Sequence, residues 1–185
     1  MYSGAVLAGG ASGRFGEDKA LFVYRGKPLL LWVLESLRGA EERFIVANRP
    51  YVGFGVPVYP DLLPGADGLS GLHPALAHAR FPWVAVAATD LPFLTRGFWD
   101  FLYEQARASP YPVVAVYNPE GHLEPLMALY HKDCLPQVER QIREGDFRLG
   151  RVVEALGATY VAAEEVVARF GERVYLNANR RADLP

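Results

Sequence analysis

The fold is decided by Leu7-Ala8-Gly9-Gly10-Ala11-Ser12-Gly13-Arg14-Phe15-Gly16-Glu17-Asp18-Lys19, which packs four glycines, one arginine and one lysine into thirteen positions. The apolar run at residues 2–8 predicts a strand, and Gly9 and Gly10 end it abruptly. Pro28 then stands where a helix can begin. Apolar residues that share one helical face follow, at Leu30, Val33, Leu34 and Leu37. Strand, glycine-rich loop and helix in this order predict the start of an α/β domain.

Further strands and helices alternate along the chain. Strands are expected at residues 44–47, 56–59, 83–88, 113–117, 126–130, 159–162 and 174–176. Helices are expected at residues 70–80, 95–108, 135–143 and 149–156. The run Trp83–Ala88 is apolar on both alternating faces, which is typical of a central parallel strand. We therefore expect one domain, residues 1–185, with a doubly wound, mostly parallel sheet, helices on both faces and one antiparallel edge strand.

Composition excludes several classes of protein. The chain has 185 residues, of which 51% are hydrophobic and 22% charged, and its formal net charge is -2. This composition suits a compact domain. The small negative net charge and the absence of a block of like charges argue against nucleic-acid binding. The single cysteine, Cys134, excludes an internal disulfide. Since no signal-peptide pattern and no apolar run of about 20 residues is present, we expect a cytoplasmic protein that does not bind membranes.

The glycine-rich loop has the composition of a phosphate site. Successive glycines let backbone N–H groups turn inwards around an anion, while Arg14 can hold phosphate oxygens with two hydrogen bonds and Lys19 adds a point charge. A glycine-rich surface loop with two solvated cations is the plainer alternative. In a doubly wound sheet, ligands bind beyond the carboxyl ends of the strands. Because both this loop and Asp90 lie at such ends, we expect them to converge.

Two better-known glycine loops do not fit. A P-loop needs Gly-Lys-Ser/Thr in succession, but Lys19 follows Asp18 and precedes Ala20. A dinucleotide-binding loop needs glycines at its first, third and sixth positions, and this loop never supplies that spacing. P-loop hydrolysis and hydride transfer therefore lose support.

The same stretch resembles the Leu-Ala-Gly-Gly-x-x-x-Arg-x-Gly-x-Asp-Lys signature of the nucleotidyltransferases, in the variant of the molybdenum cofactor guanylyltransferase (MobA-type) family. The similarity continues in order along the chain, at Gly26–Leu29, Val46–Arg49, Asp61, Gly68–Leu72, Thr89–Phe93, Glu124–Tyr130 and Asn177–Asn179. It implies the Rossmann-like nucleotidyltransferase fold.

The resemblance also implies roles for individual residues. Arg14 and Lys19 would hold the triphosphate of GTP and, with Asp90 as the Mg²⁺ ligand, carry catalysis. A carboxylate that faces bound phosphates also suits Mg²⁺ on chemical grounds. The nucleotide would further contact Leu7, Ala8, Gly9, Gly10, Asp61 and Gly71. The pterin acceptor would lie against Asn177 and Asn179, whose amides share a face if this segment is extended.

Structural explanations compete with several of these roles. Asp90 could cap a helix, although Leu91-Pro92 does not look like a helix start. Asp61 could form a turn before Leu62. Asn177 and Asn179 could satisfy backbone groups at a strand end. Leu69 and Ser70 depart from the Gly-Pro-Leu-Ala-Gly pattern of the family, which puts base selectivity in question.

The reaction implied is transfer of GMP from GTP to the terminal phosphate of molybdopterin or its metal-bearing form, with release of pyrophosphate. Proteins that carry the cofactor and the enzymes that receive it would be its partners. One alternative is transfer from CTP or another nucleotide to the pterin, or to a sugar or polyol phosphate. The other alternative is not an enzyme but a regulatory protein that binds GTP without catalysing a reaction.

Overall fold

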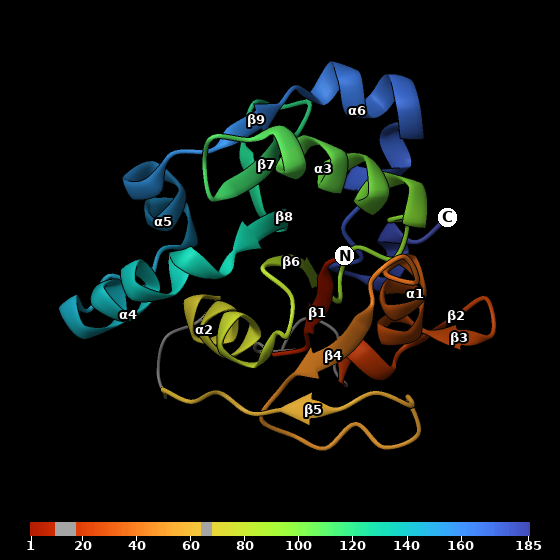
Figure 1. Ribbon diagram of the computed structural model, residues 1–185. Helices are drawn as coiled ribbons and strands as arrows, with labels where there is room; N and C mark the ends of the chain where they lie inside the picture. Colours follow the sequence, from red (N-terminus) through yellow and green to blue (C-terminus); the bar gives the residue numbers. More distant parts are fainter. Residues whose placement is uncertain (10–17, 64–67) are drawn as a thin grey trace.

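The computed structural model describes residues 1–9, 18–63 and 68–185. Its main sheet has seven strands in the order β5-β4-β1-β6-β8-β7-β9 (Figure 1). These strands are β1 Ser3–Leu7, β4 Glu42–Val46, β5 Val58–Tyr59, β6 Trp83–Ala88, β7 Val113–Tyr117, β8 Leu123–His131 and β9 Thr159–Val161. A small antiparallel ribbon joins β2 Val23–Tyr24 to β3 Lys27–Pro28.

The α-helices of the described residues are α1 Leu29–Ser36, α2 Leu69–His78, α3 Arg96–Ala108, α4 Leu135–Glu144, α5 Leu149–Leu156 and α6 Ala163–Phe170. Short 3-10 helices are η1 Lys19–Leu21, η2 Lys132–Cys134, η3 Glu172–Tyr175 and η4 Arg181–Asp183. In this part of the chain, no helix combines the length and apolar character needed to cross a bilayer.

Helices cover both faces of the sheet, because the central strands are apolar on both sides. Figure 1 shows α1, α3 and α6 on one side of the sheet and α2, α4 and α5 on the other. Alternate residues of β6 enter two separate cores: Ala85 and Ala87 pack with residues of α1, α3 and α6, whereas Val84 and Val86 pack with residues of α2, α4 and α5. The expected doubly wound fold is therefore confirmed, with β6 between β1 and β8.

The position of the antiparallel strand corrects one expectation. β8 runs antiparallel to both β6 and β7, but it lies inside the sheet rather than at its edge. The reason is the short turn at 118–122, which folds β8 back beside β7 so that it inserts next to β6. As a result, the amino end of β8 lies at the same edge as the carboxyl ends of β1, β4 and β6.

The chain after β9 also differs from expectation. Most of the strand predicted at 174–176 is part of the 3-10 helix η3. The structure also contains α6, a helix that the sequence pattern does not predict. Val174 is buried and the Tyr175 hydroxyl donates to the Tyr117 carbonyl over 2.8 Å, so tertiary contacts here override the β preference of these residues.

A buried hydrogen bond joins the two helices that cover one face. The Trp99 indole N–H in α3 donates to Ser36 Oγ in α1 over 3.0 Å, and Ser36 Oγ donates in turn to the Val33 carbonyl over 2.6 Å. Trp99 is fully buried, so the hydroxyl of Ser36 satisfies a donor that water cannot reach.

We expect Ser36→Ala to lower the free energy of unfolding by about 1–3 kcal/mol, because the Trp99 N–H is left buried without an acceptor. Urea unfolding measures this loss. Trp99→Phe removes the donor, so the double variant should lose less than the sum of the two single variants. Strictly additive losses would contradict this account of the bond.

Candidate active site

Three segments far apart in the sequence meet at one lysine. The Lys19 ammonium in η1 lies 3.4 Å from Asp90 Oδ2, just beyond β6, and donates to Asn179 Oδ1 over 3.0 Å. The side chains of Lys19 and Asp90 are 20% and 28% exposed, so the pair is accessible at the edge of the sheet. The structure thus brings Lys19, Asp90 and Asn179 together. Arg14 and Gly10 lie outside the described residues.

Asp18 fixes the start of the short helix that carries Lys19. Its carboxylate accepts the Ala20 N–H over 3.1 Å, which caps η1, and it accepts from Arg49 Nη1 over 2.7 Å. The Tyr51 hydroxyl donates to the same carboxylate over 3.0 Å. Burial, followed by this hydrogen bond to Asp18, raises the pKa of Tyr51 to about 12.

Sequence reasoning missed this role for Asp18. Its partners Arg49 and Tyr51 follow β4, some thirty positions downstream, and no local pattern connects them to it. The adjacent positions of Asp18 and Lys19 are the only available signal, since a helix cap directly before a functional residue would orient it.

The segment with the two asparagines is anchored to the strand end that carries Asp90. The Ala178 N–H donates to the Asp90 carbonyl over 2.8 Å, and the Ala178 side chain is fully buried against Leu29. The Asn179 N–H donates to the Asn177 carbonyl over 2.9 Å, which makes a tight turn rather than the expected extended segment. This turn directs Asn179 to Lys19. Among the described residues, the Asn177 side chain has no hydrogen-bond partner.

Asp61 lies elsewhere on the same edge. It is paired with Asn48, whose Nδ2 donates to Asp61 Oδ2 over 3.0 Å and whose Oδ1 accepts the Asp61 N–H over 2.9 Å. This double contact links the chain after β5 to the chain after β4, which are neighbouring strands. The hydrogen bonds of Asp61 in the described part of the chain are those with Asn48, and none joins it to Lys19 or Asp90.

The backbone at the end of β1 is closely packed. Leu7 and Ala8 are buried, and the Ala8 N–H already donates to the Val46 carbonyl over 2.9 Å. A Cβ added at Gly71 would lie only 3.0 Å from Leu7 Cδ1, whereas one added at Gly9 would meet no atom of the described residues within 4 Å. Gly71 thus lets α2 approach β1.

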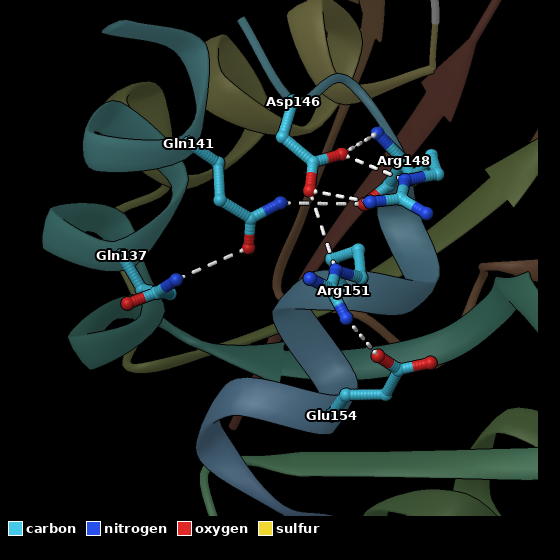
Figure 2. A network of polar contacts seen from close by, with 6 residues as sticks. All are labelled: Gln137, Gln141, Asp146, Arg148, Arg151 and Glu154. Carbon is cyan, nitrogen blue, oxygen red and sulfur yellow. Dashed lines mark hydrogen bonds and ion pairs between the residues drawn. The ribbon is translucent and has the colours of Figure 1, made fainter. Parts of the chain in front are cut away.

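A charged network rigidifies the loop between α4 and α5 (Figure 2). Asp146 accepts from Arg148 Nε over 2.9 Å and from Arg151 Nε over 3.3 Å, while Gln141 donates to the Arg148 carbonyl. The hydrogen bonds from Arg148, more than those from Arg151, hold the pKa of Asp146 well below its usual range. Leu149 next to this loop lies close to Gly68, where α2 begins.

The oxygen atoms around Lys19 suit a hard divalent cation. The Asp90 carboxylate and the Asn179 amide oxygen are the ligand types that Mg²⁺ takes, usually with phosphate oxygens and water completing its shell. Across the described residues, no three His, Cys, Asp or Glu side chains gather as a metal site. The donor set therefore fits a cation shared with a bound phosphate rather than one held by the protein alone.

Comparisons with known proteins agree with this geometry. The chain matches the MobA-like NTP transferase domain over residues 4–160. It is 39% identical over 181 residues to a Deinococcus radiodurans protein named as a probable molybdenum cofactor guanylyltransferase, a match that covers 97% of this chain and 90% of that one. The family match spans most of the chain, including β1, β4 and β6 with the residues that follow them.

Two solved structures share the fold. The molybdopterin-guanine dinucleotide biosynthesis protein A of Archaeoglobus fulgidus superposes with a TM-score of 0.84 at 27% identity, over 98% of this chain and 94% of that one. The 2-C-methyl-D-erythritol 4-phosphate cytidylyltransferase of Thermus thermophilus gives 0.70 at 19% identity, over 100% and 96%, which shows the fold alone. With the sheet order, the strand-end site and the matched domain in agreement, the chain belongs to the MobA-like NTP transferase family.

Proposed function

We propose that this protein transfers GMP from GTP to the terminal phosphate of molybdopterin, or of its metal-bearing form, and releases pyrophosphate. The convergence of Lys19, Asp90 and Asn179 at the carboxyl edge of the sheet carries the proposal, because it sets a cation beside a carboxylate where a triphosphate would lie. The names of the relatives in Deinococcus and Archaeoglobus support the choice of guanine nucleotide and pterin acceptor.

The nucleophile in this reaction is already an anion, so the chain needs no general base and forms no covalent intermediate. Its tasks are to bring two negatively charged phosphates together and to stabilise charge that grows on the α-phosphate and the leaving pyrophosphate. Lys19 is assigned to the triphosphate, and Arg14 adds a second cation. The backbone at Leu7, Ala8, Gly9 and Gly10 is assigned to the nucleotide.

Asp90 would hold a divalent cation, which we propose to be Mg²⁺, with the Asn179 amide oxygen within reach of the same region. When bound, such a cation would offset the negative charge of the phosphates. Asn177 and Asn179 are assigned to the acceptor, and Asp61 and Gly71 to the base and ribose.

We expect the enzyme in the reducing cytoplasm, together with proteins that carry the pterin cofactor and enzymes that receive the dinucleotide. Cys134 is buried, and burial raises the pKa of its thiol to about 12, which suits a structural rather than a reactive cysteine.

Lys19→Ala and Asp90→Ala should each lower kcat/KM by about 10²–10³, because each removes a preorganised charge from the transition state. Pyrophosphate release from GTP in the presence of molybdopterin measures the loss, and far-ultraviolet circular dichroism checks the fold. Lys27→Ala is the matched control, since Lys27 pairs with Glu35 over 2.6 Å on the β2–β3 ribbon side of the molecule. Near-normal turnover in either site variant would remove the assignment.

GTP should support faster turnover than CTP, ATP or UTP at equal concentration. The same four nucleotides, compared by thermal shift with Mg²⁺ present, should stabilise the protein in the same order, because binding to the native state raises the melting temperature. Preference for CTP in both assays would favour the cytidylyl alternative. GTP binding without pyrophosphate from any acceptor would favour a regulator.

A further inference from the structure

Glu124 is the second residue of β8 and lies near Asp90, whose negative charge acts on its carboxyl group. The antiparallel pairing of β6 with β8, in which Ala87 pairs with Met127, brings the start of β8 to the edge where β6 ends. In the order β5-β4-β1-β6-β8, β8 is on the far side of β6 from β1. Glu124 therefore belongs to the strand on the side of β6 away from β1.

The turn at residues 118–122 holds the carboxylate of Glu124 in place. Asn118 is 9% exposed, and its Oδ1 accepts the N–H groups of Glu120 over 3.1 Å and His122 over 2.9 Å. Because two backbone donors set the orientation of this amide, its Nδ2 faces Glu124 and donates to Oε1 over 2.7 Å. One oxygen of Glu124 is thus fixed by the protein.

The other oxygen of Glu124, Oε2, stands apart from the hydrogen bond with Asn118. Among the described residues, Oε2 makes no hydrogen bond or ion pair, although the side chain is partly buried. Burial raises the pKa of Glu124, and the nearby Asp90 and Glu120 carboxylates add to the effect, while Asn118 and His122 oppose it. Tyr175 also lies near Glu124, two residues before Asn177. A partly desolvated carboxylate without a cation is costly unless another group donates to it.

We infer that Glu124 binds the acceptor substrate, with Oε2 accepting a hydrogen bond from an N–H or O–H group of its heterocycle. The inference rests on the proposed function and adds a residue to the acceptor half of the site. The partner is a neutral donor rather than the acceptor phosphate, because the carboxylate of Glu124 and a phosphate repel each other. A phosphate monoester without such donors should therefore be a poor acceptor.

Binding of molybdopterin, measured at equilibrium without turnover, tests the inference. Glu124→Ala should weaken molybdopterin binding by about 10- to 100-fold, as expected for loss of a hydrogen bond to a charged group. GTP affinity, measured separately, should change less than about twofold. Glu124→Gln retains an acceptor oxygen without the charge, so it should recover about half of the lost binding free energy.

Two further variants separate binding from structure. Asn118→Asp keeps the acceptor for the two turn N–H groups but places a carboxylate beside Glu124 in place of the donor, so it should weaken molybdopterin binding and, through repulsion between the two carboxylates, lower the melting temperature, while GTP affinity stays nearly unchanged. Glu120→Ala removes an exposed carboxylate from the same turn and should bind molybdopterin like the parent protein. In turnover, Glu124→Ala should raise KM for the acceptor far more than it lowers kcat.

Unchanged molybdopterin affinity in Glu124→Ala overturns the inference. An equal loss of GTP and molybdopterin affinity together with a lowered melting temperature also overturns it, because this result marks a structural role. A parent protein that binds no molybdopterin overturns it as well. The proposed function is contradicted by another result, a parent protein that binds both substrates but releases no pyrophosphate. In that case the binding data still decide the role of Glu124.

Discussion

The contact between the Lys19 ammonium and the Asp90 carboxylate is the interaction on which the site depends. It is partly exposed, and ion pairs of this kind contribute only about 0–1 kcal/mol to stability. Its importance is therefore positional. Asp18 holds the start of η1, and the backbone bond from Ala178 holds the chain beside Asp90, so both charges are in place before a substrate arrives. Charges placed in advance stabilise a transition state without reorganising during the reaction.

The two-faced core explains why the chemistry lies at one edge. The central residues of β1 and β6 are buried on both sides, so their side chains pack against helices and do not face a substrate. Only residues just beyond the strand ends are exposed to a ligand while still held by a rigid sheet. The close approach of Gly71 to Leu7 continues this packing to the last residue of β1.

The spacing of apolar residues is sufficient to predict many of the strands and helices. The runs at 83–88 and 149–156 match β6 and α5, because their apolar patterns are unambiguous. The expectation that residues beyond the carboxyl ends of the strands converge is met by the contact of Lys19 with Asp90. Contacts between residues far apart in the chain cannot be predicted from the local sequence. The hydrogen bonds of Asp18 with Tyr51 and of Tyr175 with Tyr117 join residues whose local sequences carry no sign of each other. The same holds for β8, whose place inside the sheet depends on which neighbour its hairpin meets.

That internal antiparallel strand gives the site two unlike halves. Parallel strands bring only their carboxyl ends to this edge, whereas β8 brings its first residues, and with them Glu124. Among the described residues, Lys19 contacts Asp90, and Glu124 at the start of β8 lies near Asp90. A triphosphate is attracted to a cation and repelled by an unpaired carboxylate. In the proposed function, the triphosphate would therefore lie against Lys19 and the donor-bearing heterocycle of the acceptor against Glu124.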